Sequence, residues 1–410
     1  MRVLIASQYF WPENFRINEV ASTLLERGVE VEVLTAKPNY PKGEIYDNYR
    51  AWGCQQELFE TAKVFRVPLI PRGKGSGVQL AANYLSFIFF GIFCAPWMLR
   101  GRRYDVIFVH GMSPILQALP ALFLGWLKGC PVVLWVQDLW PESLAATGYV
   151  RNRFVLKLVK QIVRFIYRNV DLLLVQSEAF MAPVSVLASG TPVKYYPNSV
   201  DESFTAPSTV EVPDVAGLGD GFSIMFAGNI GTAQAVEVIV EAATLLKEHA
   251  DIQFIVLGDG SRRDWMLQEA KACNLANLRL PGRFPVETMP GFMQKASVLL
   301  VTLADQEIFA ATVPNKVQAY MAAGRPIIAC LRGEGARLVT AAKAGLAVPA
   351  ENGPALAEAV LRLYQMSVTE REEMGRNGRA YFKEHFDHER LINQLTEHLQ
   401  EVSSKGESIR

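Results

Sequence analysis

Apolar residues in this chain follow two recurring patterns: short unbroken runs, and longer segments in which they return every three or four positions. The runs predict strands buried on both faces, and the longer segments predict helices with one apolar side. The chain begins with a strand (Arg2–Ser7), a helix (about Ile17 to Glu26) and a strand (Val29–Thr35). This β-α-β order is of Rossmann type, although the GxGxxG motif is absent. Further buried strands are predicted at Val64–Val67, Asp105–Val109, Val132–Val136 and Asp171–Val175.

The alternation begins again after Ser199–Gly221, a stretch rich in proline, serine, glycine and acidic residues that we interpret as a linker. A second Rossmann-like unit follows, with strands at Phe222–Ala227, Ile252–Leu257, Leu278–Leu280, Val298–Thr302 and Pro326–Cys330, and helices at Ala233–His249, Ala355–Met366, Glu370–His385 and Glu389–Val402. We therefore expect an α/β protein of two Rossmann-like domains. Its predicted parts are domain 1–200, linker 201–221, domain 222–385, C-terminal helix 386–402 and flexible tail 403–410.

One segment, Gln79–Leu99, is almost wholly apolar and is long enough to span a bilayer. The β-α-β pattern resumes on both sides of it, and four residues interrupt it: Asn83, Ser86, Gly91 and Pro96. We therefore expect no transmembrane span. Two alternatives remain open, a helix buried in the core and a helix that leans into the membrane interface.

A second segment, Arg151–Arg168, carries six cations and no acidic residue. The cations Arg153, Lys157, Lys160, Arg164 and Arg168 recur at helical spacing, and the other face holds Phe154, Leu158, Ile162, Phe165 and Ile166. A solvated helix face is the simplest interpretation. A basic face without acidic partners favours an anionic membrane surface or a phosphate-bearing lipid. We assign the same role to Arg100, Arg102 and Arg103, which follow the apolar segment.

The charge distribution supports this assignment. The net charge is zero, but residues 1–200 hold 21 Lys and Arg against 14 Asp and Glu, and the rest of the chain has the opposite balance. The N-terminal half is therefore expected to meet an anionic partner, for which we favour a membrane rather than nucleic acid. The five cysteines are scattered and never form a CxxC pair, and the N-terminus does not resemble a signal peptide. We expect a cytoplasmic protein on the inner face of the membrane.

Polar loops follow several of the predicted strands. In the C-terminal half they are Gly228–Gly231, Gly258–Gly260 and Thr312–Lys316. Thr312 is expected to cap a helix, Pro314 suits its first turn, and Lys316 adds a positive charge. Glycines allow backbone N–H groups to approach a phosphate, and the carboxyl ends of parallel strands share one edge of a sheet. Three such loops on one edge predict a site for a nucleotide diphosphate.

Loops of the N-terminal half are candidates of the same kind. They are Tyr9–Asn14, Asn39–Gly43, His110-Gly111 and Gln137-Asp138. A buried, hydrogen-bonded histidine remains the alternative for His110. No Asp-x-Asp motif occurs, and we propose no metal site.

Taken together, these motifs resemble those of the GT-B glycosyltransferases of the large retaining family four, and more closely the bacterial enzymes of colanic-acid and O-antigen exopolysaccharide synthesis. The resemblance covers nearly the whole chain. Its motifs are SQYFWPENFRINEVA at the start, VQDLWPES from Val136, FAGNIGTAQ from Phe226, LGDG from Leu257 and VPNKVQAYMAAGRPI from Val313.

The resemblance implies two Rossmann domains facing across a cleft, with the donor on the C-terminal domain and the acceptor on the N-terminal one. The implied donor-binding residues are Asn14, Gly228, Asn229, Gly231, Gln234, Gly258, Asp259, Gly260, Arg283, Phe284, Thr312, Val313, Pro314, Asn315 and Lys316. Asp138, Lys316 and His110 are the candidate catalytic residues. Tyr40, Arg100, Arg102, Arg103, Arg153, Lys157, Lys160 and Arg164 are assigned to the acceptor or the membrane.

The sequence also departs from the family pattern. Ala311 and Ala319 stand where many members carry two glutamates, Asn14-Phe15 replaces a Gly-Gly pair, and Thr232 replaces a basic residue. Lys316, with Arg283, would then carry more of the charge that faces the donor phosphate.

The predicted function is transfer of a sugar from a nucleotide-diphosphate sugar to a polyprenyl-diphosphate-linked oligosaccharide, with retention at the anomeric carbon and without a metal or other cofactor. In this mechanism the departing phosphate accepts the acceptor proton, so no protein nucleophile is required. Two alternatives are a sugar-nucleotide epimerase of the same architecture and a non-catalytic subunit that binds sugar-nucleotide.

Overall fold

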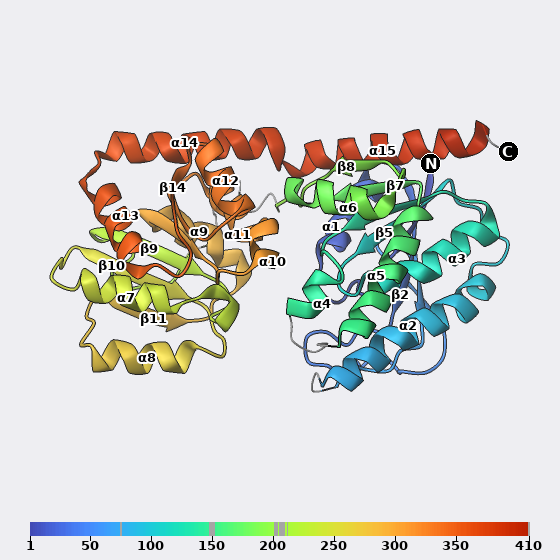
Figure 1. Ribbon diagram of the computed structural model, residues 1–410, viewed down its shortest axis with the longest axis horizontal. Coiled ribbons are helices and arrows are strands. Elements are labelled where there is room, and N and C mark those ends of the chain that lie inside the picture. The colour runs from blue at the N-terminus through green and yellow to red at the C-terminus, as the bar shows by residue number, and fades with distance from the viewer. Residues whose placement is uncertain (74–75, 147–151, 201–203, 205–209, 211, 409–410) are drawn as a thin grey trace. The chain divides into compact units, whose positions relative to one another are not determined.

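The computed structural model describes residues 1–73, 76–146, 152–200, 204, 210 and 212–408. The chain folds into two compact units (Figure 1). Unit 1 comprises Met1–Tyr196 together with Ile392–Arg410, and unit 2 comprises Pro197–Leu391. Each unit has a mostly or wholly parallel sheet with helices packed on it. The expectation of two Rossmann-like α/β domains is therefore confirmed.

Over its described residues, unit 1 contains an eight-stranded sheet in the order β3-β4-β2-β1-β5-β6-β7-β8. β3 pairs antiparallel with β4, and the other pairs are parallel. The strands are β1 (Arg2–Ala6), β2 (Glu30–Ala36), β3 (Gln55–Phe59), β4 (Ala62–Val67), β5 (Val106–Gly111), β6 (Val132–Val136), β7 (Leu172–Val175) and β8 (Val193–Tyr195). The sequence pattern missed β3 and β8. β3 is a half-exposed edge strand with polar residues, and β8 has only three residues, so neither forms an apolar run.

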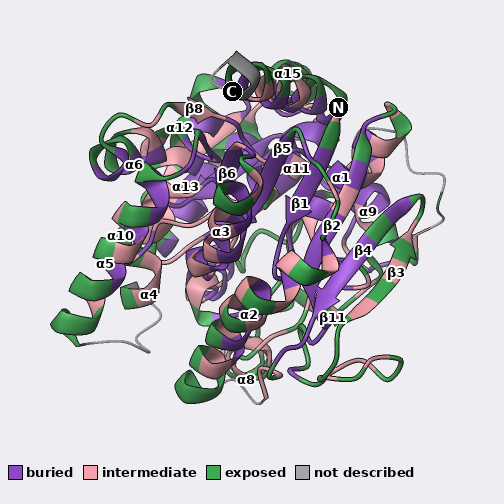
Figure 2. Cartoon of the chain, turned by 90° about the vertical axis from the view of Figure 1, so that its right-hand side faces the viewer, coloured by how far each residue is buried: buried purple, intermediate pink, exposed green. Residues whose placement is uncertain are grey.

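The helices of unit 1 cover both faces of this sheet. They are α1 (Arg16–Glu26), α2 (Gly77–Met98), α3 (Ala118–Lys128), α4 (Glu142–Ala146), α5 (Arg153–Arg168) and α6 (Met181–Ala188), with short 3-10 turns η1 (Ile115–Gln117) and η2 (Glu178–Phe180). The central strands β5 and β6 are buried throughout, and β1 is buried except at Arg2 (Figure 2). Such two-sided burial explains why they appear in the sequence as continuous apolar runs.

Unit 2 contains a parallel six-stranded sheet in the order β11-β10-β9-β12-β13-β14. Its strands are β9 (Phe222–Ala227), β10 (Ile252–Leu257), β11 (Leu278–Gly282), β12 (Val298–Thr302), β13 (Ile327–Cys330) and β14 (Gly345–Val348). Along β9, Met225 and Ala227 pack into one core cluster, and Ile224 and Phe226 pack into another. This alternation places one apolar layer on each face of the sheet.

The helices of unit 2 are η4 (Thr232–Gln234), α7 (Glu237–Leu245), α8 (Arg263–Ala272), η5 (Val286–Thr288), α9 (Met289–Lys295), α10 (Glu307–Ala311), α11 (Asn315–Ala323), α12 (Glu334–Ala341), α13 (Gly353–Gln365) and α14 (Val368–His385). The helix expected at Ala233–His249 is shorter than predicted. The 3-10 turn η4 ends at Gln234, its C-cap Ala235 has a φ of 45°, and the α-helix begins only at Glu237.

The expected linker does not stand apart from the domains. Residues 201–203, 205–209 and 211 lie outside the described part, but Val200, Val215 and Leu218 are buried in the core of unit 2. Gln318 also donates from Nε2 to the carbonyl oxygen of Asn198, 2.9 Å away. The described part of this segment therefore belongs to unit 2.

The C-terminal helix is longer than predicted, and most of it packs on unit 1. α15 runs over His388–Ser408, so the flexible tail expected from residue 403 is instead helical up to Ser408. An ion pair between Lys405 and Glu401, 2.8 Å long and one helical turn apart, stabilises this end. The buried side of α15 is formed by Leu391, Ile392, Leu395, Leu399 and Val402.

We predict that Leu395→Ala destabilises the protein by about 2–5 kcal/mol, because the substitution removes a fully buried side chain and leaves a cavity. The free energy of unfolding in urea measures the change. Glu397→Ala, at an exposed position of the same helix, is the control and should change stability by roughly 0.5 kcal/mol or less. Equal effects of the two substitutions would contradict the packing of α15 on unit 1.

Candidate functional site

The loops that follow β9 and β10 in unit 2 lie with their backbones in direct contact. A Cβ atom on Gly258 would lie 1.8 Å from the carbonyl oxygen of Gly228, and one on Gly260 would lie 2.4 Å from that of Ile230. Both glycines have positive φ angles, 146° and 152°. Only glycine fits these two positions, so the sequence fixes this close approach.

Hydrogen bonds hold the same loops together. Gly228 N–H donates to the Leu257 carbonyl, and Ile230 N–H donates to the Asp259 carbonyl, each over 2.8 Å. Asn229 donates from Nδ2 to Gln234 Oε1 over 3.1 Å, so these two predicted donor-binding amides are paired with each other. The structure therefore brings the Gly228–Gly231 and Gly258–Gly260 loops together at one edge of the sheet, as the sequence predicted.

Lys316 reaches this edge from the first turn of α11. Its Nζ lies 3.7 Å from the centre of the Phe226 ring, and a Cβ on Gly228 would lie 2.8 Å from it. The Nζ atom is buried and has no hydrogen-bond partner among the described residues. Burial lowers the pKa of Lys316 to about 7. The structure thus holds an unpaired amine against a glycine loop, a position that would suit an anion at the sheet edge.

Tyr320, one turn after Lys316, fixes α11 to the same strand. It is fully buried, and its hydroxyl accepts a hydrogen bond from the N–H of Ala227 at the end of β9. Lys316 and Tyr320 therefore point to the same strand end from one side of the helix. Nothing in the sequence pattern distinguishes this tyrosine from an apolar residue on the buried side of a helix.

The start of α11 differs from the prediction. The helix begins at Asn315 with Pro314 as N-cap and without a side-chain cap. Thr312 does not cap it, because its Oγ1 donates to the Ile308 carbonyl in the preceding helix. Val313 is buried in the core of unit 2, which leaves Asn315 and Lys316 as the polar side chains of this turn.

The remaining donor-binding candidates of unit 2 lie at its surface. Asp259 is exposed, and its Oδ1 accepts a hydrogen bond from the N–H of Gly260. Arg283 is exposed just after β11. Phe284 is half-buried, with its ring 4.8 Å from that of Phe292, so one side of Phe284 supports the core.

Asp138 follows β6 in unit 1 and is held by Ser113, which follows the neighbouring strand β5. Its Oδ2 accepts hydrogen bonds from Ser113 N–H (3.1 Å) and Ser113 Oγ (2.8 Å), and Trp140 Nε1 donates to the same Oγ. Burial raises the pKa of Asp138 above its usual value, while the two hydrogen bonds oppose this shift. The carboxylate is therefore fixed in orientation at the carboxyl edge of the sheet.

His110 lies within β5 rather than after it. The side chain is buried, with its ring 5.3 Å from that of Trp135, and Nδ1 has no hydrogen-bond partner among the described residues. Burial lowers the pKa of His110 to about 3, so the imidazole is neutral. The side chain is therefore buried, as the alternative expects, but its Nδ1 lacks the expected hydrogen bond among the described residues.

Glu13 lies in the predicted Tyr9–Asn14 loop and is buried, whereas its neighbour Asn14, the residue singled out from the sequence, is exposed. Glu13 Oε1 accepts hydrogen bonds from the N–H groups of Asn39 (2.8 Å) and Tyr40 (2.7 Å), so it joins the loops after β1 and β2. Burial outweighs these bonds and raises the pKa of Glu13 to about 7. The only signal in the sequence was an acidic residue in an otherwise aromatic loop.

Three aromatic rings and an arginine form a second group that the analysis did not foresee. The Phe15 ring lies 5.1 Å from that of Tyr9 and 5.2 Å from that of Tyr40. The Arg72 guanidinium lies over both tyrosines and donates to the Tyr9 hydroxyl over 2.9 Å. Tyr40, predicted to contact the acceptor, is 39% exposed, so this cluster offers a ring and a cation to a ligand.

The predicted basic residues differ in what they contact. Arg102 forms an ion pair with Glu32 and packs over the Phe65 ring, so it has a structural role. Arg100, Arg103, Arg153, Lys157 and Lys160 are exposed, and Arg164 is half-buried. Arg151 lies outside the described residues. On α5, Phe154, Leu158 and Phe165 are 85%, 62% and 55% exposed, because Val159, Val163, Ile166 and Tyr167 form the buried side.

Among the described residues, no group of three or more His, Cys, Asp or Glu side chains lies close enough to hold a metal ion. The groups gathered at the edge of unit 2 are backbone amides and an amine. They are suited to binding an anion.

Comparison with known proteins covers both units. Residues 14–198 match the family model "Glycosyl transferase 4-like domain", and residues 221–366 match "Glycosyl transferases group 1". The chain is 26% identical to WbjE of Pseudomonas aeruginosa, named as a probable glycosyltransferase, over 77% of each chain. It is also 26% identical to WcaI of Escherichia coli K12, over 79% of this chain and 82% of that one. WcaI is named "Putative colanic acid biosynthesis glycosyl transferase".

A solved structure of Alr3699/HepE from Anabaena, in complex with UDP, has the same fold. It superposes with a TM-score of 0.67 at 13% identity, over 98% of this chain and 100% of that one. The two sheets, the two domain matches and this similarity agree. The chain is therefore a glycosyltransferase of the GT-B fold, with the group 1 match confined to residues 221–366.

Proposed function

We propose that this glycosyltransferase moves a sugar from a nucleotide-diphosphate sugar to a polyprenyl-diphosphate-linked oligosaccharide during bacterial surface polysaccharide synthesis. The observation that carries the donor assignment is the buried, unpaired amine of Lys316 beside the Gly228 loop. The relatives named for glycosyl transfer, one of them for colanic acid biosynthesis, support the polysaccharide class.

The donor's diphosphate fits the edge of unit 2 for electrostatic reasons. A diphosphate is anionic, and an anion near Lys316 would favour the protonated amine that burial now disfavours. The uncapped N-terminus of α11 directs backbone N–H groups and a partial positive charge toward the same edge. The solved HepE complex with UDP supports a nucleotide of this type.

The proposed reaction proceeds with retention of anomeric configuration. The acceptor hydroxyl attacks the anomeric carbon from the face that the diphosphate leaves, so one carbon–oxygen bond forms as another breaks. The departing phosphate oxygen takes the hydroxyl proton. Lys316 stabilises the negative charge that grows on this phosphate, and Asp138, held by Ser113, contacts the donor sugar or the acceptor.

The two glutamates of the family pattern are absent, since Ala311 and Ala319 occupy their positions. A bound sugar-nucleotide would then face two fewer carboxylates. Lys316 and Arg283 would therefore contribute a larger share of the electrostatic attraction. We propose that these two residues, with the backbone amides of the glycine loops, provide most of the attraction for the diphosphate.

The acceptor is assigned to unit 1 and its lipid to the membrane. On α5, the exposed Arg153, Lys157 and Lys160 lie beside exposed Phe154 and Leu158. Cations next to apolar residues on one surface are typical of helices that bind an anionic interface. We propose that this helix holds the protein, by electrostatic attraction, at the cytoplasmic face where a lipid-linked acceptor would be met.

One assay separates this function from the two alternatives. The protein is incubated with UDP-linked and GDP-linked sugars and a polyprenyl-diphosphate oligosaccharide. Sugar transfer with a retained anomeric centre, read by NMR, supports the proposal. Isomerised donor would indicate an epimerase, and binding without turnover would indicate a non-catalytic subunit.

We predict that Lys316→Met lowers kcat by about 10²–10³-fold, because a charge that stabilises the departing phosphate is lost. The fold should remain intact, since the substitution replaces an unpaired buried amine with an apolar chain of similar length. Lys295→Met, at an exposed position of unit 2, is the matched control and should retain full activity. Near-normal turnover of Lys316→Met would show that the phosphate is held elsewhere.

We predict that UDP or GDP binding near pH 8 is accompanied by uptake of almost one proton. At that pH, Lys316 with its pKa of about 7 is mostly neutral, and the bound diphosphate raises this pKa. Calorimetry in buffers of different ionisation enthalpy measures the uptake. It should disappear in Lys316→Met, and equal uptake by both proteins would exclude Lys316 as the group that titrates.

We predict that transfer continues in the presence of EDTA. The proposed stabilisation of the leaving phosphate comes from an amine and backbone amides and requires no divalent ion. Initial rates with and without EDTA, after treatment of the protein with chelating resin, check this. Loss of activity that Mg²⁺ or Mn²⁺ restores would contradict the mechanism.

A further inference from the structure

Helix α2 buries two polar side chains, Asn83 and Ser86, beside Phe87, and leaves many of its apolar residues exposed. Asn83 is fully buried; its Oδ1 accepts a hydrogen bond from Gln8 Nε2 (2.8 Å), and its Nδ2 donates to the Ile70 carbonyl (2.7 Å). Ser86 is also buried and accepts a hydrogen bond from Ile70 N–H over 3.0 Å. These bonds fix the inner side of α2 against unit 1.

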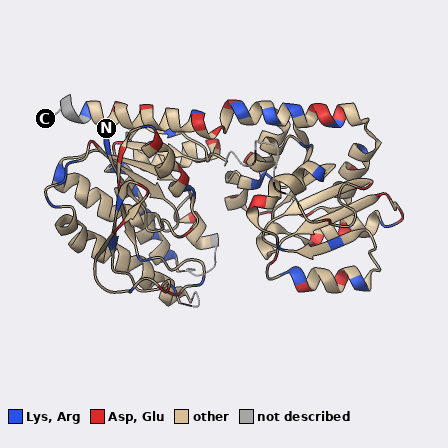
Figure 3. Cartoon of the chain, turned by 180° about the vertical axis from the view of Figure 1, so that it is seen from behind, with Lys and Arg blue, Asp and Glu red and all other residues tan. Residues whose placement is uncertain are grey.

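The outer side of α2 is apolar and exposed. Leu85, Phe89, Phe93 and Trp97 recur at every fourth position and are 60%, 55%, 66% and 73% exposed. The exposed stretches of α2 are visible in Figure 2. The helix contains no charged residue, whereas the surface helices α8 and α14 of unit 2 carry both signs of charge (Figure 3).

The neighbouring helix α3 extends this surface. α2 and α3 pack closely, since a Cβ on Gly91 would lie 2.7 Å from Cγ of Pro120. On α3, Trp126 and Leu127 are 77% and 51% exposed. We define the apolar face of unit 1 as these exposed residues of both helices: Leu85, Phe89, Phe93, Trp97, Trp126 and Leu127.

The observed packing decides between the two alternatives for this segment. α2 is long and apolar enough to cross a membrane, but only 28% of its most apolar 18-residue segment is buried in the protein. The core-helix alternative is therefore wrong. The inner side is tied to unit 1 by hydrogen bonds of Asn83 and Ser86, so the helix is not free to be surrounded by lipid. A helix that lies along an interface has one such face in protein and the other in lipid.

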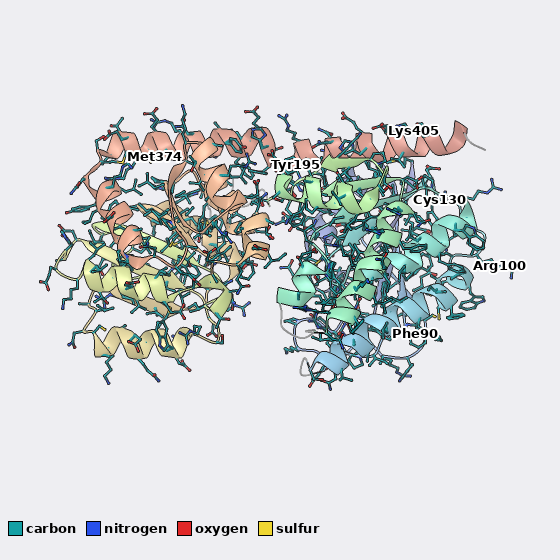
Figure 4. All side chains as sticks on the ribbon, in the orientation of Figure 1. Phe90, Arg100, Cys130, Tyr195, Met374 and Lys405 are labelled. Carbon is teal, nitrogen blue, oxygen red and sulfur yellow. The ribbon has the colours of Figure 1, made fainter. Side chains whose placement is uncertain are left out.

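The charges at the end of α2 indicate what kind of partner covers the apolar face of unit 1. Arg100 and Arg103, both exposed, follow the helix directly, and Figure 4 shows Arg100 beyond the helix that carries Phe90. Tryptophan next to arginine is the arrangement found where a helix meets lipid headgroups. Several exposed aromatic side chains without interspersed charge are poorly suited to water.

We propose that the apolar face of unit 1 inserts into the hydrocarbon boundary of an anionic bilayer, with Arg100 and Arg103 at the level of the headgroups. The inference goes beyond the proposed membrane contact of α5, which is electrostatic and weakened by salt. Insertion of aromatic side chains is driven by burial of apolar surface and resists salt.

Cosedimentation with vesicles of phosphatidylethanolamine and phosphatidylglycerol tests the proposal. At about 1 M NaCl, where charges are screened beyond roughly 3 Å, the wild-type protein should remain bound. Phe93→Glu and Trp97→Glu should each weaken this binding by about ten- to a hundredfold, because an aromatic side chain that would insert into the bilayer is replaced by a charge. Both positions are exposed, so the fold should be unaffected.

Two controls separate this surface from other effects. Val186→Glu changes an equally exposed apolar residue on α6 and should leave binding unchanged. Lys157→Glu with Lys160→Glu should weaken binding only at low salt. In addition, lipids brominated along their acyl chains should quench tryptophan emission, and Trp97→Phe should reduce that quenching.

Two outcomes would overturn the proposal. The first is release of the wild-type protein from vesicles at high salt, which would mean that its adhesion is electrostatic only. The second is a wild-type dimer in sedimentation equilibrium that Trp97→Glu dissociates, which would mean that a second copy covers this face. Neither measurement uses sugar or acceptor. A failure of the membrane proposal can therefore be told apart from a failure of the proposed glycosyl transfer.

Discussion

The buried, unpaired amine of Lys316 makes the sheet edge of unit 2 suited to an anion. Lys316 Nζ is buried against the Phe226 ring and beside Gly228, without a hydrogen-bond partner among the described residues. A buried charge without a partner is costly, and a pKa of about 7 lets the protein hold the group largely neutral above that pH. An anion bound beside Lys316 would stabilise the protonated amine. The burial that costs stability in the free protein would therefore favour binding of a diphosphate.

The rest of the edge is built around backbone rather than side chains. Gly258 and Gly260 leave room for the carbonyl groups of Gly228 and Ile230, and Tyr320 ties α11 to the end of β9. The loops are thus preorganised before any ligand binds. In unit 1, the buried Glu13 joins two loops at the corresponding edge, and Ser113 orients Asp138. Both units place polar groups at strand ends because the faces of each sheet are covered by helices.

Helix α2 connects the fold of unit 1 to its surroundings. A soluble helix normally exposes polar side chains, but α2 buries Asn83 and Ser86 beside Phe87 and exposes a row of large apolar residues. The inner hydrogen bonds attach α2 to unit 1, and the outer apolar residues are suited to contact with lipid. α5 offers a different contribution, because its exposed side mixes cations with apolar residues. The two helices would supply hydrophobic and electrostatic attraction respectively.

The sequence by itself determined the two Rossmann-like domains, most of their strands and the three polar loops of unit 2. Buried parallel strands need continuous apolar runs, and positions such as Gly258 admit only glycine, so both leave a direct mark in the sequence. The sequence could not reveal the edge strand β3, whose half-exposed residues lack an apolar pattern. It also predicted a tail where α15 continues to Ser408.

Tertiary structure alone decided which side chains are paired and which are free. Arg102 and Arg103 are neighbours of the same type, yet one is paired with Glu32 and the other is exposed. Glu13 and His110 are polar residues whose burial depends on loops and strands distant in the chain. The orientation of α2 likewise depends on Ile70 and Gln8, which accept or donate its inner hydrogen bonds. Periodicity records that a residue is apolar, but only packing determines whether it faces protein or solvent.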